Sequence, residues 1–388
     1  MKKTISILGS TGSIGLTTLR IIDKKKNFFS INILSANRNY KLIIKQIKKY
    51  RPSCFIVSNY ATFLKVKKNN FKYCKIINKF DDINLKIKSD ATVCAIPGIA
   101  GLKPTIQLIK SSKKIFLANK ESIVCGWNII KKIAKKNHTR IIPIDSEHFS
   151  ISKLLLKHNI KNIKKIYITA SGGPFLNYPI NKLKNIKPSD AIKHPKWKMG
   201  KKISVDSSTM VNKILELIEA QKLFEIPDEK IDIIIHPNSL VHALVELNNG
   251  LFELIYHETS MIIPIANAIF DGNLKIEDFY KEKKSIFKEK LIFKNIDKKR
   301  FPIIKIRNFL NKFPFSGIIL NASNEILVDQ FLKKKIPFLA ISKIIMSILR
   351  DRNYTQNAIV IPKNLNQIIE LDNWARKKTF SIINKFYG

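Results

Sequence analysis

The sequence of 388 residues has few cysteines, few acidic side chains and no long apolar run, and each shortage excludes a class of protein. Its four cysteines form no CxxC pair and no matched histidine spacing, which disfavours a zinc site or a disulfide framework and favours reduced, buried thiols. No apolar run approaches the ~20 residues of a membrane-spanning helix, so we expect no membrane partner. The apolar run at the N-terminus is also too short for a signal peptide, and the first predicted strand starts at once, so we expect a cytoplasmic location.

Acidic residues number 29 against 70 lysines and arginines, which gives a formal charge of +41. Such a charge is typical of nucleic-acid-binding proteins. However, the lysines are spread through every segment, Ile, Asn and Phe are over-used with them, and lysine clusters such as 131–132 and 333–335 lack interleaved aromatics. We interpret the charge as compositional drift that leaves a solvated basic surface, which attracts anionic substrates, and we expect no nucleic-acid partner. A basic nucleic-acid-binding protein with a relic dinucleotide domain stays open as an alternative, which tight, salt-dependent RNA binding without cofactor binding would favour.

The length predicts two or three domains, and the first 149 residues alternate short apolar strands with helices. Strands are predicted at 4–8, 31–36, 53–58, 90–96, 114–118 and 140–144, and helices at 16–25, 40–50, 60–68 and 102–111. This alternation is typical of an α/β fold with a Rossmann-like, doubly wound parallel sheet.

A glycine-rich turn, Gly9-Ser-Thr-Gly12-Ser-Ile-Gly15, joins the first predicted strand to the first helix. Glycines there allow close backbone approach, and the helix N-terminus receives a pyrophosphate. The G-x-x-G-x-x-G spacing is less specific than the commoner G-x-G-x-x-G, but its position supports it. The next strand ends in Asn37-Arg38-Asn39 without the carboxylate expected for NAD, and Arg38 can pair with a 2′-phosphate, so NADP is predicted.

Polar side chains also follow two later strands of this sheet. Asn119-Lys120-Glu121-Ser122 stands at the carboxyl end of one strand, where open parallel sheets bind ligands, so Lys120 is expected to contact a phosphate or carbonyl group. Asp145 and Glu147 are two residues apart at a strand end, and their carboxylates can point the same way. Two converging carboxylates need a cation between them, and oxygen ligands favour Mg²⁺ or Mn²⁺.

The stretch 194–220 is the most informative part of the chain. Residues 194–202 place Trp197 and Met199 between a proline and Gly200, a pattern that predicts a lid loop. A short strand is predicted at 203–205, followed by a helix whose start offers the cap oxygens of residues 206–209 to an anion.

On that helix Asn212, Lys213 and Glu216 share one face. A solvated face with an ordinary ion pair is the plainer interpretation. The hydroxyl-rich helix start and the Trp-bearing lid before it instead favour a site for a phosphorylated substrate and a metal.

The remaining segments complete the predicted architecture. A Ser171-Gly-Gly turn after a strand at 167–170 offers N–H groups and a hydroxyl to an anion. Strands at 231–236, 241–247 and 251–256 are expected to form an antiparallel sheet, with a hairpin turn at 248–250. Helices are predicted at 321–334, 338–350 and 364–386. We therefore expect a Rossmann-like NADPH-binding domain (1–149), a central α+β catalytic, metal-binding and dimerisation domain (150–270) with the lid 194–202, a connector (271–312) and a C-terminal helical bundle (313–388).

Taken in order, Gly9–Gly15, Asn119–Ser122, Asp145-Ser-Glu-His148, Ser171-Gly-Gly-Pro-Phe175 and 194–220 resemble the 1-deoxy-D-xylulose 5-phosphate reductoisomerase family, nearly end to end. The two stretches Asp-Ser-Glu-His and His-Pro-x-Trp-x-Met-Gly-x-Lys are more specific together than any glycine-rich loop. The resemblance implies a metal-dependent rearrangement of a sugar phosphate and its reduction by NADPH to 2-C-methyl-D-erythritol 4-phosphate. It further implies a homodimer that acts in the non-mevalonate route to isoprenoid precursors.

The same resemblance assigns roles by position. It implies a metal site for Mg²⁺, Mn²⁺ or Co²⁺ made by Asp145, Glu147 and Glu216, which with Lys120 would be the catalytic residues. It implies substrate contacts from Lys120, Ser146, Ser171, His194, Trp197, Met199, Ser207, Asn212, Lys213 and Glu216. It implies cofactor contacts from Thr11, Gly12, Ser13, Ile14, Asn37, Arg38, Asn39, Asn119, Glu121 and Gly200.

The chain departs from the family pattern at three places. Asn37 and Ile214 stand where the family usually has Gly, and Thr259-Ser-Met-Ile262 stands where Pro-Asp-Met-Arg is frequent. These departures concern cofactor affinity and lid packing and remove no implied metal ligand or phosphate contact. A different NADP-dependent oxidoreductase on the same scaffold remains the second alternative, and indifference to a chelator would favour it.

Overall fold

The structure, a computed structural model, describes residues 2–388 except 198, 282–288, 314 and 360. The chain forms two compact units, and each is described by itself. Unit 1 comprises Met1–Ser122, Asn128–Phe149 and Ser260–Lys283, and unit 2 comprises Ile123–Trp127, Ser150–Thr259 and Lys284–Gly388. No helix in the described part of the chain is long and apolar enough to cross a membrane.

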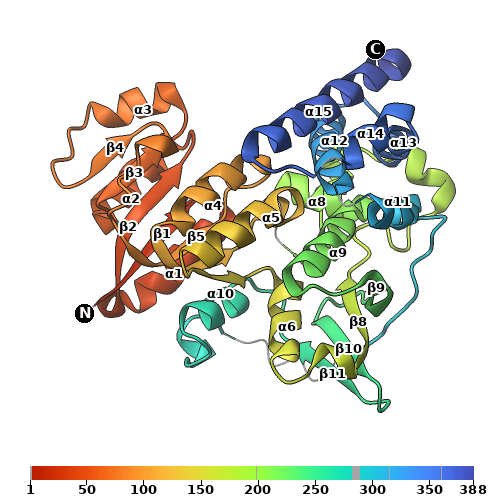
Figure 1. Cartoon of the computed structure of the whole chain (residues 1–388), viewed down its shortest axis with the longest axis horizontal. Helices are drawn as coiled ribbons and strands as arrows, with labels where there is room; N and C mark the ends of the chain where they lie inside the picture. Colours follow the sequence, from red (N-terminus) through yellow and green to blue (C-terminus); the bar gives the residue numbers. More distant parts are fainter. Residues whose placement is uncertain (1, 198, 282–288, 314, 360) are drawn as a thin grey trace. The chain divides into compact units, whose positions relative to one another are not determined.

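Unit 1 contains a seven-stranded parallel sheet in the order β4-β3-β2-β1-β5-β6-β7 (Figure 1). The strands are β1 Lys3–Leu8, β2 Phe29–Ala36, β3 Cys54–Val57, β4 Lys75–Ile77, β5 Ser89–Cys94, β6 Ser112–Leu117 and β7 Arg140–Pro143. From β1 the chain proceeds outwards through β2, β3 and β4, then returns to place β5 on the other side of β1. This reversal is the switch point at which doubly wound sheets bind ligands, and the predicted fold class is confirmed.

Most of the helices of unit 1 follow its strands in sequence, and one helix from later in the chain, α10, also belongs to this unit. They are α1 Ser13–Lys24, α2 Tyr40–Tyr50, α3 Tyr60–Lys67, α4 Leu102–Ile109, α5 Lys120–Lys136, α6 Ser146–Leu155 and α10 Ile262–Ile269. The residues of α5, and those of α6, are divided between the two units. The sequence patterns did not predict α6 or α10, and of α5 they placed only the lysine clusters 131–132 and 135–136 on a helix surface. In α10, Pro264 discourages a helix assignment, yet it falls in the first turn, where proline is tolerated.

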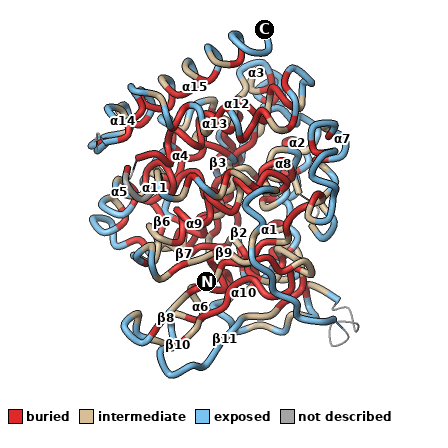
Figure 2. The backbone as a smooth tube through the Cα atoms, turned by 90° about the vertical axis from the view of Figure 1, so that its right-hand side faces the viewer, coloured by how far each residue is buried: buried red, intermediate tan, exposed pale blue. Residues whose placement is uncertain are grey.

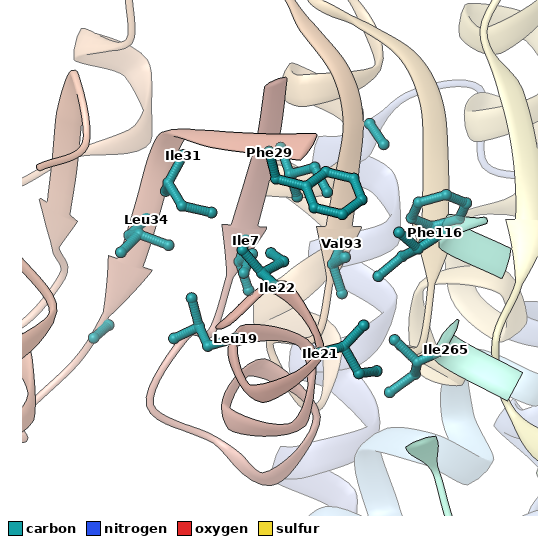
Figure 3. Packing of buried hydrophobic residues seen from close by; sticks show 14 of the residues in the cluster. Ile7, Leu19, Ile21, Ile22, Phe29, Ile31, Leu34, Val93, Phe116 and Ile265 are labelled. Atoms are coloured by element: carbon teal, nitrogen blue, oxygen red, sulfur yellow. The ribbon is translucent and has the colours of Figure 1, made fainter. Parts of the chain in front are cut away.

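The core of unit 1 joins strands and helices far apart in the sequence. Ile7 of β1 and Val93 of β5 are buried against Ile21 of α1, and Ile265 of α10 belongs to the same cluster (Figure 3). Each buried side chain of this size contributes about 1.5–3 kcal/mol relative to exposure. The core therefore attaches α10 to unit 1.

The four cysteines are buried and free, as predicted. Burial raises the pKa of the Cys54 thiol to about 11 and the pKa values of Cys74 and Cys94 to about 12. These three thiols stay protonated at neutral pH and are poor nucleophiles.

Unit 2 contains a four-stranded sheet in the order β11-β10-β8-β9. Its strands are β8 Ile163–Ala170, β9 Ile231–Ile235, β10 Val241–Leu247 and β11 Phe252–Tyr256. The predicted hairpin of β10 and β11 is confirmed, with Gly250 at φ +87° in its turn. The prediction of a purely antiparallel sheet is wrong, because β9 pairs with β8 in parallel. Helices α8 Lys201–Thr209 and α9 Val211–Phe224 lie in the crossover that a parallel pair requires.

The predicted strand at 203–205 is also wrong, since these residues lie within α8. Lys202 and Asp206, four residues apart, form an ion pair at 2.8 Å that only a helix can align. Met210 then adopts a left-handed conformation, φ +66°, which separates α8 from α9. Residues 206–209 therefore form the end of α8, and the N-cap position of α9 is Met210 instead; of the predicted cap oxygens, Thr209 Oγ1 accepts from Val211 N at 3.4 Å.

The C-terminal part of unit 2 is helical, as predicted. Its helices are α11 Arg307–Lys312, α12 Ser316–Leu332, α13 Phe338–Leu349, α14 Arg352–Ile359 and α15 Leu365–Tyr387. Elsewhere in unit 2, the short helix α7 spans Pro188–Ala191. Helix α12 is buried along most of its length, whereas the C-terminal end of α15 is exposed (Figure 2). Within the predicted connector, residues 282–288 lie outside the described part, and residues 302–312 are helical.

Candidate active site

The glycine-rich turn lies at the carboxyl end of β1, beside the switch point. Gly9 has φ +81°, and a Cβ there would lie 2.7 Å from the carbonyl oxygen of Ala95, so only glycine fits. The turn residues Thr11, Gly12, Ser13 and Ile14 are exposed or half-buried. Among the described residues no side chain caps α1, and its first turn holds no acidic residue, so the N–H groups at its start can bind an anion.

Asn37, Arg38 and Asn39 follow β2, the strand next to β1, and all three are exposed. The Asn39 side chain caps α2 by accepting from Leu42 N at 3.2 Å. Within the described part of the chain, the Arg38 guanidinium has no ion pair or hydrogen bond. It is therefore available to an anion at the edge of the sheet where the glycine-rich turn also lies.

Asn119 ties together two loops at the carboxyl end of the sheet. It is buried, and its amide donates to the carbonyl oxygens of Ile96 and of Gly98, the latter at 2.9 Å. Its own oxygen accepts from Ser122 N at 2.6 Å and caps α5. Asn119 thus fixes the loop after β5 to the start of α5, where Lys120 and Glu121 follow.

Asp145 stands between β7 and α6 in a cationic environment. Lys120 Nζ lies 3.1 Å from its Oδ2, and His148 Nδ1 lies 3.4 Å from the same atom. Burial by itself would raise the pKa of Asp145, but Lys120 and His148 outweigh burial and hold that pKa well below its usual range. Asp145 is therefore ionised at neutral pH, as a metal ligand must be.

Asp145 and Glu147 bring carboxylate oxygens within 4.8 Å of each other. Strand alternation is not the reason, because Glu147 lies in the first turn of α6; the helix start brings the two side chains together. Ser146 Oγ donates to Glu147 Oε2 at 2.5 Å. An all-oxygen donor pair with a neighbouring lysine fits a hard divalent cation. The third predicted ligand, Glu216, belongs to unit 2.

Ser171, at the carboxyl end of β8, is paired with His194. His194 Nδ1 accepts from Trp197 N at 2.9 Å, so a neutral imidazole carries its proton on Nε2. That Nε2–H donates to Ser171 Oγ at 2.9 Å, and Gly173 N donates to the same oxygen at 3.1 Å. With both lone pairs of Ser171 Oγ engaged, its O–H is left to donate to a ligand.

The Ser171-Gly-Gly turn packs against α8. Gly173 has φ +64°, and a Cβ there would lie 3.1 Å from both Ser207 O and Ser208 Cα. Unit 2 therefore brings the Ser171 turn and the Ser207 segment into contact, although 36 residues separate them in the sequence.

Asn212, Lys213 and Glu216 form one buried polar group on α9. The Asn212 amide donates to one Glu216 oxygen, and Lys213 Nζ pairs with the other. Lys213 is 5 % exposed and Glu216 2 %. Burying two charges is costly even when they are paired, so such a group indicates function more than stability.

The structure describes the predicted lid except Lys198. Trp197 is half-buried and lies edge-on to His242, with ring centroids 5.9 Å apart. His242 in turn stacks on His257 at 3.9 Å. Met199 is half-buried, and Gly200 begins α8 with open space around its Cβ position, so this conformation does not itself require glycine there.

Three residues have structural roles in this region that the sequence patterns do not indicate, although the Ser171-Gly-Gly turn itself is predicted to bind an anion. Gly173 allows the close approach to α8, and Asn324 of α12 binds Asp206. His257 stacks on His242, whose ring Trp197 contacts edge-on. The sequence pattern predicts a capping role for Asp206. Only the doubled glycine after Ser171 carried a signal that could have suggested one of them.

The departures from the family pattern have different settings. Asn37 is exposed at the end of β2, whereas Ile214 is fully buried within α9. Ile262 starts α10 and joins the core of unit 1, which explains an apolar residue at that position.

Comparison with known proteins gives one family along most of the chain. A model of 1-deoxy-D-xylulose 5-phosphate reductoisomerase matches residues 5–126, that enzyme's C-terminal domain model matches 141–224, and a DXP reductoisomerase C-terminal domain model matches 257–378. The 1-deoxy-D-xylulose 5-phosphate reductoisomerase of Pelagibacter ubique (strain HTCC1062) is 45 % identical over 389 residues, covering 98 % of this chain and 99 % of the relative. The enzyme of the same name from Wolbachia pipientis wMel is 40 % identical over 381 residues, covering 96 % of each.

Solved structures of the same family superpose closely. A DOX-P reductoisomerase in complex with NADPH, fosmidomycin and magnesium has a TM-score of 0.91 at 33 % identity and covers 98 % of both chains. The Zymomonas mobilis 1-deoxy-D-xylulose 5-phosphate reductoisomerase in complex with NADPH has a TM-score of 0.88 at 31 % identity and covers 99 % of both chains.

Proposed function

The chain belongs to the 1-deoxy-D-xylulose 5-phosphate reductoisomerase family, and from this premise we propose the roles of its residues in that reaction. The substrate, 1-deoxy-D-xylulose 5-phosphate, is rearranged within the molecule and reduced to 2-C-methyl-D-erythritol 4-phosphate, an isoprenoid precursor. The observation that carries the proposal is the contact between the Ser171-Gly-Gly turn and the Ser207 segment, beside the buried Asn212–Lys213–Glu216 group.

We assign the substrate phosphate to Ser171, Ser207, Asn212 and Lys213. The hydroxyl of Ser171 is turned outward as a donor because His194 and Gly173 occupy its acceptor sites. The Lys213 ammonium supplies positive charge, and its burial strengthens its attraction to a phosphate. Phosphate binding at this remote end supplies binding energy that holds the reacting end in place.

We assign the reacting end of the substrate to Lys120 and Ser146. Lys120 reaches Asp145 and can contact a carbonyl oxygen from the same position, and Ser146 offers a hydroxyl at the start of α6. Trp197 and Met199 exclude water from the substrate, which protects a reactive aldehyde from side reactions.

We assign a divalent cation to Asp145, Glu147 and Glu216, whose carboxylates offer the hard oxygen ligands that Mg²⁺ prefers and Mn²⁺ or Co²⁺ accepts. When bound, the cation supplies Lewis acidity to the ketone and its neighbouring hydroxyl, and NADPH supplies the hydride. Lys213 neutralises Glu216 and Lys120 neutralises Asp145, so these lysines stabilise the carboxylates before the cation arrives.

We assign NADPH to the glycine-rich turn and to the end of β2. The turn residues 11–14 bind the pyrophosphate and Arg38 pairs with the 2′-phosphate, flanked by Asn37 and Asn39. Asn119, Glu121 and Gly200 complete the cofactor contacts.

We also propose a cytoplasmic homodimer. β11 is an edge strand of its sheet and exposes Phe252 and Leu254, and such an edge can pair with a second copy. We further propose that the chain is divided by function into an NADPH-binding domain (1–149), a catalytic domain (150–270), a connector (271–312) and a C-terminal helical domain (313–388).

The test follows nicotinamide absorbance when purified protein meets 1-deoxy-D-xylulose 5-phosphate, NADPH and Mg²⁺. We expect oxidation that stops with a chelator, returns with Mg²⁺ or Mn²⁺ and is much slower with NADH. Activity indifferent to the chelator would contradict the metal assignment and favour a different NADP-dependent oxidoreductase. Folded protein that binds NADPH but leaves this substrate unchanged would overturn the proposed function.

A further inference from the structure

A buried polar pair connects the C-terminal helices to the segment that carries Ser207. Asp206, the residue before Ser207 in α8, is 1 % exposed, and Asn324 of α12 is 0 % exposed. Asn324 Nδ2 donates to Asp206 Oδ1 at 2.7 Å, and Lys202 Nζ donates to Asp206 Oδ2 at 2.8 Å. Each carboxylate oxygen of Asp206 is therefore held by one donor.

The two donors differ in what they can fix. Lys202 lies four residues before Asp206 on the same helix, so its ion pair stabilises α8 but does not orient the helix. Asn324 belongs to a separate helix 118 residues further along the chain. Its bond to Asp206 therefore restrains the rotation of α8 relative to α12.

The rotation of α8 matters because Ser207 sits between two fixed points. On one side the Gly173 turn abuts the Ser207 and Ser208 backbone. On the other side Met210, buried and left-handed, ends the helix. A turn of α8 about its axis would shift Ser207 relative to the Ser171-Gly-Gly turn that contacts it, and the Asp206–Asn324 bond opposes that turn.

We propose that Asn324 is a positioning residue for the phosphate pocket, acting through Asp206 on Ser207. The proposal rests on the proposed role of Ser207 as a phosphate ligand. It gives the C-terminal helical bundle a part in substrate binding although none of the proposed substrate contacts belongs to the bundle.

Three variants test the pair. Asn324→Asp sets a second carboxylate against Asp206 and removes the donor. Asp206→Asn removes the charge that both donors share. The exchange Asp206→Asn with Asn324→Asp rebuilds the pattern with the bond reversed, because the new residue 206 amide donates to the residue 324 carboxylate while its oxygen still accepts from Lys202. Asp329→Asn is the matched control, since Asp329 forms an exposed ion pair on the same helix.

The readouts separate positioning from stability. We expect Asn324→Asp to raise KM for the sugar phosphate about tenfold or more, with kcat changed less than threefold and the NADPH dissociation constant within twofold. The dissociation constant for inorganic phosphate, taken from the phosphate dependence of the unfolding temperature, should rise in parallel. The exchanged pair should recover most of this loss, and the Asp329 control should match the parent protein.

Two results would overturn the proposal. One is an Asn324→Asp protein whose phosphate affinity equals that of the parent. The other is an exchanged pair that regains the parent unfolding temperature but not phosphate affinity. If Asn324→Asp does not fold, Asn324→Ser, which removes the amide donor without adding charge, takes its place with the same expected loss. A parent protein that binds phosphate yet leaves the sugar phosphate unchanged would refute the proposed reaction. The role of the Asp206–Asn324 pair would still be tested, because phosphate affinity is measured without turnover.

Discussion

Replacing Gly173 by alanine tests the contact between the Ser171 turn and α8. At φ +64° an alanine costs about 1–2 kcal/mol, because its Cβ crowds the backbone in the left-handed region. The new Cβ would also lie 3.1 Å from Ser207 O and Ser208 Cα, which must move by a few tenths of an ångström. Overpacking of this kind costs about 1–3 kcal/mol more. We therefore expect Gly173→Ala to lose about 2–5 kcal/mol of the free energy of unfolding and to displace Ser207.

Gly250→Ala is the matched control for the backbone effect. Gly250 has φ +87° in the β10–β11 turn, but its Cβ position is open, with nothing within 4 Å. We expect this control to lose only about 1–2 kcal/mol. Both variants thus carry the backbone strain, but only Gly173→Ala adds a steric contact with α8.

The assay measures both stability and phosphate affinity. Denaturant unfolding gives the two free energies, and the phosphate dependence of the unfolding temperature gives the dissociation constant for inorganic phosphate. We expect Gly173→Ala to weaken phosphate binding about tenfold, or about 1.4 kcal/mol, and Gly250→Ala to leave it unchanged. Equal phosphate affinity in the two variants would refute the idea that this contact shapes the pocket.

Three further predictions address the cofactor, the metal and pH. Arg38→Ala should weaken NADPH binding about tenfold or more while changing NADH binding little, as measured by fluorescence titration; an unchanged NADPH/NADH preference would count against the 2′-phosphate contact. Glu216→Gln should abolish turnover while NADPH affinity stays within twofold; equal loss of both would argue against the proposed division of roles. Burial lowers the pKa of Lys222, which donates to Val124 O at 2.7 Å, to about 8. Since its unfolded pKa is higher, the unfolded chain binds more protons between about pH 8 and 10.5, and this group's contribution to stability rises with pH by up to about 3 kcal/mol. Lys222→Met should lack that rise in denaturant unfolding, and parallel pH curves for the two proteins would contradict it.

The sequence predicted the parts of the fold that depend on local patterns. The glycine-rich turn between β1 and α1, the apolar strands of unit 1 and the β10–β11 hairpin each carry a period or a turn residue that specifies them. It failed at α8, where Ile203, Ser204 and Val205 have the composition of a strand. Burial of α8, which depends on tertiary structure, overrides that local preference, and the Lys202–Asp206 pair four residues apart supports the helix from within.

The candidate site divides in the same way. Side chains with distinctive chemistry, such as Asp145 and Glu216, could be selected from the sequence. The residues proposed to position Ser207 could not, because the contacts of Gly173 and Asn324 are with segments distant in the chain. Nothing in a short motif encodes a contact between a turn at residue 173 and a helix at residue 207.

The most direct test of the central claim follows the carbon skeleton of the product. Substrate labelled with ¹³C at the ketone carbon would be incubated with the protein, NADPH and Mg²⁺, and the product examined by NMR. A reductoisomerase must place the label at a branched carbon of 2-C-methyl-D-erythritol 4-phosphate. A label recovered in an unbranched pentitol phosphate would show reduction without rearrangement and would contradict the account.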